Sequence, residues 1–151
     1  YREFSNALTY VVVELAKAMV RDGEGASHFI SIRVSGARCR AEAKQVAMAV
    51  AKSALGKTAG YGRDANWGRV ACAAGYSGAD IDPARVTIWL GDMEVLRHTE
   101  PLPLDEARAA AFLSQTDIPI RIDLGQGSSE VTVWTCDLTH AYVDVNAHYR
   151  T

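Results

Sequence analysis

The first part of the chain alternates between helical and extended spacing of its apolar residues. Over residues 5–21 the apolar side chains recur with the spacing of one helix face, which predicts a helix that stops at Asp22-Gly23. Over residues 28–35 they alternate with polar ones, which predicts a strand with one face toward the core. Helical spacing returns over residues 39–53, where many small residues would let the helix lie close against a sheet.

A glycine-rich stretch and a short helix are expected next. Glycines at 56, 60 and 62 interrupt any regular pattern, so residues 53–66 are predicted to form a loop. Asn66 is typical of an N-cap, because its side-chain oxygen can accept a backbone N–H at a helix start. We therefore predict a short helix from Asn66 to about Tyr76, closed by Gly78.

The middle of the chain indicates a hairpin and another helix. Residues 85–90 and 93–97 are strand candidates joined across Gly91-Asp92, which favours a β-hairpin. After Pro101-Leu102-Pro103, Asp105 is expected to cap a helix that runs to Gln115.

The last third shows the strictest alternation. Residues 118–124 alternate, and Gly125-Gln126-Gly127 leads into a second alternating run over residues 131–135, which predicts another β-hairpin. A last short strand is expected over residues 142–145. The pattern predicts an α+β fold, in which an antiparallel or mixed sheet packs with helices in a single domain spanning residues 1–151.

Composition and charge narrow the class of protein. A hydrophobic share of 48% and a charged share of 23% are those of a soluble globular protein. Sixteen basic and eighteen acidic residues give a net charge of −2 without a dense basic run, which argues against nucleic acid as a partner. The apolar run over residues 10–13 is far too short to span a membrane. Because residue 1 is Tyr rather than Met, we interpret the chain as a piece of a longer protein.

The cysteines and histidines do not indicate a metal, a cofactor or a hydrolytic triad. Cys39, Cys72 and Cys136 are an odd number without C-x-x-C spacing, and no histidine pairs with them at zinc-ligand spacing. We expect reduced thiols in a cytoplasmic protein, buried as small core residues. The four histidines, His28 among them, have no partners visible in the sequence that would form a Ser/His/Asp set.

A polar cluster around Trp67 admits two interpretations. Lys57, Asp64, Asn66 and Arg69 would suit a phosphate or carboxylate, or they would serve the fold, with Asn66 as a cap and Asp64 paired to Arg69. We favour the structural interpretation. Nucleotide binding is set aside, because neither glycine-rich nucleotide motif is present.

Four stretches together carry a resemblance. They are Arg21-Asp22-Gly23-Glu24-Gly25-Ala26, Lys57-Thr58-Ala59, Asn66-Trp67-Gly68-Arg69 with Gly75-Tyr76-Ser77-Gly78, and Cys136-Asp137-Leu138-Thr139 leading to Val145-Asn146-Ala147-His148-Tyr149-Arg150-Thr151. Their order and spacing resemble the ornithine acetyltransferase (glutamate N-acetyltransferase) family, over essentially the whole chain and in the later part of its self-cleaved β subunit. Ala65 stands where the family usually has proline, which relaxes the backbone but removes no side-chain chemistry.

The resemblance implies an acyltransferase of arginine biosynthesis with an N-terminal-nucleophile architecture. In the family, a threonine freed by autocatalytic cleavage attacks the acetyl group of N-acetylornithine, and the acetyl-enzyme then acetylates glutamate. An oxyanion hole in the α subunit stabilises the developing charge, and the subunits assemble as a heterotetramer. The resemblance thus implies that the nucleophile lies upstream and that no residue of this chain is catalytic.

What the resemblance assigns to this chain is substrate binding, by Glu24, Asn146 and Thr151. A carboxylate at Glu24 suits an ammonium group of ornithine. Asn146 offers a donor and an acceptor, and Thr151 adds a hydroxyl beside a chain-terminal carboxylate. Without the resemblance, these residues would be interpreted as an exposed turn residue, a strand-end residue and a terminal residue.

Two other classes of function stay open. One is an N-terminal-nucleophile amidohydrolase that passes the acyl group to water, and the other is a non-catalytic assembly module that buries its hairpin faces against a partner. The sequence leaves undecided whether acetyl-CoA is also a donor, whether the acceptor is glutamate or another amine, and how many subunits assemble.

Overall fold

The structure, a computed structural model, describes residues 1–148. Its helices are α1 (Arg2–Arg21), α2 (Arg40–Lys52), α3 (Ala54–Gly62), α4 (Trp67–Gly75), α5 (Glu106–Leu113) and α6 (His140–His148), with a short 3₁₀ turn η1 (Pro83–Arg85). Its strands are β1 (Phe29–Ala37), β2 (Thr87–Leu90), β3 (Met93–Arg97), β4 (Glu100–Pro101), β5 (Asp117–Asp123) and β6 (Ser129–Cys136). Within this described part of the chain, no helix has the length and apolar character needed to span a bilayer.

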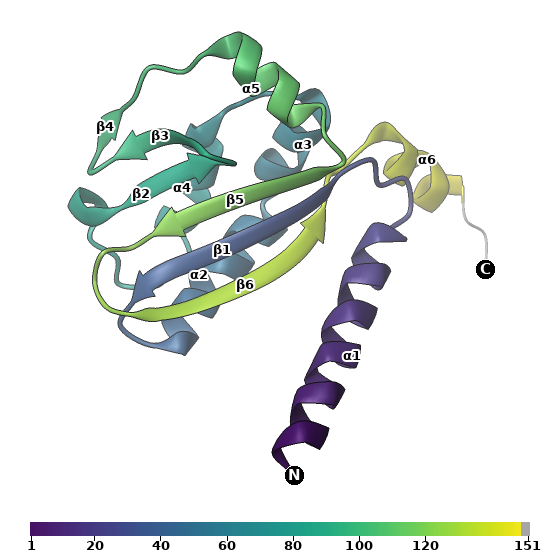
Figure 1. The fold of residues 1–151 in the computed structure, drawn as a ribbon. Helices are drawn as coiled ribbons and strands as arrows, with labels where there is room; N and C mark the ends of the chain where they lie inside the picture. Colours follow the sequence, from purple (N-terminus) through teal and green to yellow (C-terminus); the bar gives the residue numbers. More distant parts are fainter. Residues whose placement is uncertain (149–151) are drawn as a thin grey trace.

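The described strands form one sheet in the order β4-β3-β2-β5-β1-β6. β1 and β5 run parallel, and every other pair of neighbours is antiparallel. Figure 1 shows α2, α3 and α4 gathered on one face of the sheet, while α1 extends away from the sheet beside its β6 edge. Helices packed on a mixed sheet confirm the predicted α+β class.

The core lies between this sheet face and the helices, as the alternation in the strands requires. Val34 of β1, Ile88 of β2 and Ile122 of β5 are each 0% exposed, and so is Val46 of α2. These residues belong to one hydrophobic cluster. Because successive side chains of a strand point to opposite faces, the alternate residues, such as Arg33, are exposed on the other face of the sheet.

The hairpin predicted across Gly125-Gln126-Gly127 is wrong, although both of its strands exist. β5 and β6 do not pair with each other, because β1 lies between them. The connection over residues 124–128 therefore crosses two strand spacings, about 10 Å, and bonds the end of β1 on its way. The Gln126 N–H donates to the Gly36 carbonyl at 2.7 Å. Local alternation cannot reveal an inserted strand, since the pattern within each strand is the same in both cases.

The loop predicted over residues 53–66 is also wrong, because most of it forms α3. The Ser53 side chain accepts a hydrogen bond from the Gly56 N–H at 3.1 Å and so caps the helix. One glycine in this helix has a packing role: a Cβ on Gly60 would lie 3.1 Å from Cδ1 of Ile30. The glycines taken as a sign of a loop thus include one that lets α3 lie close to the sheet.

The strand predicted over residues 142–145 is helical instead and belongs to α6. Aromatic and β-branched residues such as Tyr142 and Val143 favour strands in general. Here the Thr139 hydroxyl accepts a hydrogen bond from the Tyr142 N–H at 3.2 Å and begins a helix.

The remaining predicted elements are present, with small shifts at their ends. The hairpin of β2 and β3 and the helix capped by Asp105 are confirmed, the Asp105 side chain accepting from the Arg108 N–H. The expected burial of the cysteines is wrong for Cys39 and Cys72, which are exposed, and Cys136 is only half-buried.

Candidate functional site

The sheet brings two distant segments of the chain to one corner. In the antiparallel pairing of β1 and β6, Phe29 lies opposite Cys136, so the first residue of β1 faces the last residue of β6. The residues just before β1 and just after β6 must therefore be neighbours. Figure 1 shows the result, with the C-terminal end of α1 and the start of α6 at the same corner of the molecule.

Glu24 and Asn146, the two predicted binding residues that the structure describes, are in contact at this corner. Asn146 Nδ2 donates to Glu24 Oε2 at 2.9 Å, although 122 positions separate the two residues. The same nitrogen donates to the Tyr142 carbonyl at 2.8 Å, one turn earlier in α6. Both side chains are exposed. The third predicted residue, Thr151, lies outside the described residues.

The oxygen atoms of Glu24 and Asn146 that this contact does not use have the chemistry to bind a cation. Both contacts of Asn146 use its amide nitrogen, so its Oδ1 remains an acceptor. Glu24 accepts from Asn146 through Oε2, and within residues 1–148 its other oxygen has no hydrogen-bond partner. An ammonium group carries only donors, which matches two acceptor oxygens of which one is charged.

Glu24 sits in a tight turn that leads from α1 to β1. The Ala26 N–H donates to the Gly23 carbonyl at 2.9 Å and closes a turn of residues 23–26. Gly25 within it has a φ of +68°, in the left-handed region that favours glycine. Glu24 therefore stands at the tip of a reverse turn whose shape depends on the next residue.

Asp137, directly after β6, holds the far side of this turn and was not singled out from the sequence. Its carboxylate accepts from the Ser27 N–H at 2.8 Å and from the His28 N–H at 2.9 Å, and its side chain is fully buried. Burial raises the pKa of Asp137, but the hydrogen bonds from Ser27 and His28 outweigh it and place that pKa below its usual value. The available signal was its place in the Cys136-Asp137-Leu138-Thr139 motif.

No Ser/His/Asp set was visible in the sequence, yet the structure brings Ser27 and Asp137 to His28, in an arrangement that is not that of a catalytic triad. His28 Nδ1 lies 2.9 Å from Ser27 Oγ and 3.1 Å from Asp137 Oδ2. A catalytic triad needs the serine and the aspartate on different ring nitrogens, so that one nitrogen takes the serine proton while the aspartate orients the ring through the other. Here one nitrogen faces both partners, and the imidazole is 8% exposed. The cluster fixes the start of β1.

Arg69, Asp64 and Asn66 of the polar cluster around Trp67 make contacts within the fold. Arg69 donates to the Leu55 carbonyl at 3.0 Å and lies 3.5 Å from the Asp64 carboxylate, which confirms the expected pairing. Asn66 is at the N-cap position of α4, but the predicted side-chain cap bond is absent and its amide points to Asp64 instead. A mostly apolar hollow of about 470 Å³ adjoins this cluster, lined by Ser53, Ala54, Leu55, Asn66, Gly68, Arg69, Cys72 and Tyr76.

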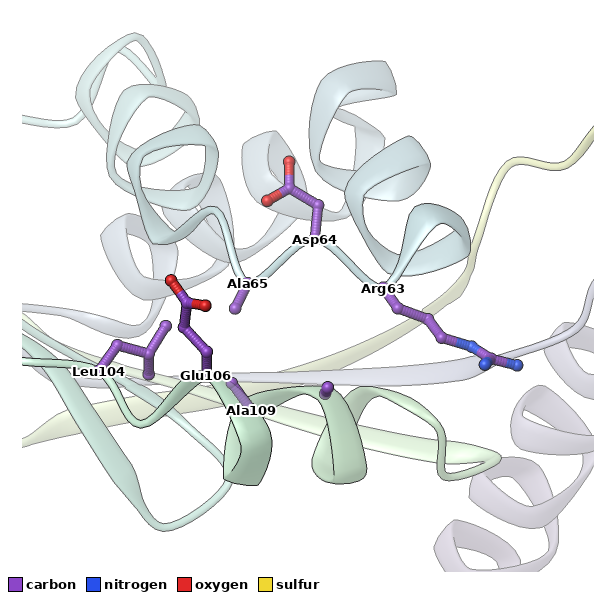
Figure 2. A pocket seen from close by; sticks show the side chains of 7 residues that line it. Arg63, Asp64, Ala65, Leu104, Glu106 and Ala109 are labelled. Carbon is purple, nitrogen blue, oxygen red and sulfur yellow. The ribbon is translucent and has the colours of Figure 1, made fainter.

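A second hollow, of about 270 Å³, lies between the α3–α4 loop and α5. Figure 2 shows Glu106 rising from α5 toward this loop, while the guanidinium of Arg63 points away along the surface. Its lining includes Arg63, Asp64 and Glu106, a mixture of charges that selects no ligand class. Within residues 1–148 no group of three or more His, Cys, Asp or Glu side chains is arranged to hold a metal ion.

Comparison with known proteins gives consistent matches along the whole chain. The model of the ArgJ family matches residues 1–151. The arginine biosynthesis bifunctional protein ArgJ of Symbiobacterium thermophilum is 50% identical over 151 residues, which are 100% of this chain and 38% of that protein. The mitochondrial ArgJ of Schizosaccharomyces pombe is 44% identical over 99% of this chain and 35% of its own length.

A solved structure agrees with these matches. The crystal structure of the arginine biosynthesis bifunctional protein ArgJ of Bacillus halodurans superposes with a TM-score of 0.95 at 42% identity. The match covers 98% of this chain and 70% of that one. The chain thus spans less than two fifths of the length of the curated relatives named above.

Proposed function

The chain belongs to the ArgJ family, and we propose that it is the later part of an acyltransferase that moves the acetyl group of N-acetylornithine to glutamate. Two observations support this proposal. Relatives named for arginine biosynthesis match the whole chain, and the contact of Glu24 with Asn146 leaves acceptor oxygens suited to an ammonium group. The second observation carries the part of the proposal that concerns this chain.

The proposed reaction has two steps. A threonine hydroxyl in the part of the protein outside this chain attacks the acetyl carbon, the C–N bond to ornithine breaks, and the hydroxyl proton ends on the departing amine. The amino group of glutamate then attacks the acetyl-threonine ester, and the threonine oxygen regains a proton as the C–O bond breaks. Both steps need the amino acid held at a fixed distance from one hydroxyl, since a misplacement of about 1 Å can cost roughly 100-fold in rate.

This chain contributes the group that holds the amino acid. N-acetylornithine has one free ammonium group, because its other nitrogen carries the acetyl group. Glu24 binds this ammonium through its carboxylate, and Asn146 fixes the rotamer of Glu24 while adding its own oxygen. Thr151, outside the described residues, is the third group of the proposed binding set.

The exposed face of α1 supports a role for this chain inside a larger assembly. Residues Val13, Ala16 and Val20 are half-buried on the side facing β6. The opposite side of the helix carries exposed apolar side chains, at Phe4, Leu8, Val11, Val12, Leu15 and Met19. A continuous apolar stripe is typical of a protein interface. We propose that it packs against the remaining part of the same precursor, including the α subunit, in a heterotetramer.

The test is acetyl transfer by the full-length protein. With N-acetylornithine and glutamate, N-acetylglutamate should form, and intact-mass measurement without glutamate should show an acetyl adduct on the subunit that contains this chain. Glu24→Gln should lower kcat/KM for N-acetylornithine about 10- to 100-fold, because a charge-assisted hydrogen bond is worth about 1.5–3 kcal/mol.

A matched control is Glu130→Gln. Glu130 is an exposed carboxylate paired with Arg33, and it lies at the other end of β6 from the candidate site. This variant should keep the kinetics of the unaltered protein. If acetate were released at the same rate with and without glutamate, the protein would be a hydrolase instead. If Glu24→Gln and Glu130→Gln had equal kinetics, Glu24 would not belong to the substrate site.

A further inference from the structure

We propose that Thr139 is a positioning residue that sets the Glu24 turn against the helix carrying Asn146. The geometry of this role comes from the structure, while its effect on kinetics rests on the proposed function. Thr139 is the last residue before α6 and is 6% exposed. It does not contact the candidate ligand groups itself, so its role is exerted through them.

One hydroxyl joins both halves of the site. Thr139 Oγ1 donates to the Gly25 carbonyl at 2.7 Å, next to Glu24 in the turn. The same oxygen accepts from the Tyr142 N–H at 3.2 Å, in the first turn of α6. Tyr142 in turn supplies the carbonyl that receives the Asn146 amide. The hydroxyl therefore fixes the turn and the helix start relative to each other.

The two backbones are close enough that the spacing is tightly constrained. A Cβ built on Gly25 would lie 2.6 Å from the Tyr142 nitrogen and 2.8 Å from the Ala141 carbonyl carbon. With glycine at this place, the backbones approach each other until the Thr139 hydroxyl can bond both. Asp137 holds residues 27 and 28 by separate bonds, so Thr139 acts on the part of the turn that carries Glu24.

Two substitutions of Thr139 isolate the chemistry of the position, and a third, at Thr135, serves as the control. Valine has nearly the shape of threonine but can neither donate to the Gly25 carbonyl nor accept from the Tyr142 N–H. Serine keeps both bonds. Thr135→Val is the matched control, because the Thr135 hydroxyl donates to a carbonyl too, that of Ala51 at 3.1 Å, on the core side of β6.

The experiment measures kcat and KM for N-acetylornithine in the full-length protein, beside thermal unfolding. Thr139→Val should raise KM at least about fivefold, the equivalent of losing one net hydrogen bond, because the acceptor oxygens move relative to each other. Thr139→Ser should stay within about twofold of the unaltered protein, and Thr135→Val should lower the unfolding temperature without raising KM. A KM for Thr139→Val equal to that of Thr135→Val would overturn the proposal.

Crystal structures of the Val and Ser variants test the geometry without reference to activity. In Thr139→Val the distance from Asn146 Nδ2 to Glu24 Oε2 should exceed hydrogen-bond range, and in Thr139→Ser it should stay near 2.9 Å. A protein without acetyltransferase activity would refute the proposed function, while this distance would still decide the positioning role. If Thr139→Val does not fold, Thr139→Ala replaces it, and failure of both to fold beside a folded Ser variant would mean that Thr139 only supports the fold.

Discussion

A methyl group added at Gly25 should destabilise the turn that carries Glu24, and the loss in free energy should exceed what any contact of the Glu24 side chain contributes. Gly25 has a φ of +68°, where an alanine costs roughly 1–2 kcal/mol. Its Cβ would also approach backbone atoms, 2.6 Å from the Tyr142 nitrogen and 2.8 Å from the Ala141 carbonyl carbon. Backbone atoms cannot rotate aside as a side chain does. The start of α6 must shift as a whole, and such overpacking typically costs about 1–3 kcal/mol.

These two effects predict that Gly25→Ala lowers the free energy of unfolding by about 2–5 kcal/mol. The measurement is urea unfolding of the full-length protein at pH 7, followed by fluorescence. Gly62→Ala is the control, because a Cβ there meets nothing within 4 Å and the residue ends α3. Because alanine favours helices, Gly62→Ala should lower the free energy of unfolding by no more than about 0.5 kcal/mol.

Loss of activity should accompany the loss of stability in Gly25→Ala, since the turn and α6 move apart. Hydrogen exchange of peptides covering residues 20–28 and 137–146 locates the damage, and both should exchange faster than in Gly62→Ala. Two alanine variants of equal stability would refute the reasoning, because they would show that the turn has room for a side chain.

Two further predictions concern Asp137 and α1. Folding lowers the pKa of Asp137, so its contribution to stability is complete above the usual carboxyl pKa of about 4 and falls as the pH drops further. Asp137→Asn should cost about 1–3 kcal/mol at pH 7 and flatten the stability curve below about pH 4, as urea titrations across that range would reveal. Leu15→Glu on the apolar stripe should reduce the assembled complex on size-exclusion chromatography, whereas Asn6→Glu on the other side of α1 should not. Equal assembly of both variants would place the stripe outside any interface.

Secondary structure was predictable wherever one face of an element is buried. Over β1 the alternation of Ile30, Ile32 and Val34 matches side chains that are at most 3% exposed. The period of two follows from the pleat, so it is visible in a single sequence. The strand prediction failed over residues 142–145, which lie exposed in α6 and so have no buried face to set a pattern.

Strand order was not predictable from the same pattern. Nothing in residues 118–135 distinguishes a hairpin from a pair separated by β1, since the insertion depends on contacts with residues 29–37. Parallel pairing of β1 with β5 joins residues almost ninety positions apart, such as Ile30 and Ile118. Such long-range pairing is set by the packing of the whole sheet and has no local signal.

The candidate site was predictable only in part, and only through the resemblance. Glu24 and Asn146 have no local feature that marks them, yet the structure places them in hydrogen-bond contact. Asp137 and Thr139 were visible as parts of a motif, but their roles depend on the turn before β1. A role defined by a contact across more than one hundred positions requires the register of β1 against β6.

That dependence follows from the energies involved. The bond between Glu24 and Asn146 is exposed, and exposed polar pairs contribute about 0–1 kcal/mol, too little to hold two segments in one geometry against thermal motion. The geometry must therefore come from buried neighbours, where a lost partner costs about 1–3 kcal/mol because no water replaces it. Asp137 and Thr139 are 3% and 6% exposed, and they bond the backbone that follows Glu24, Thr139 at Gly25 and Asp137 at residues 27 and 28. The atoms proposed to face the ligand are thus exposed, while the residues that place them lie out of the solvent.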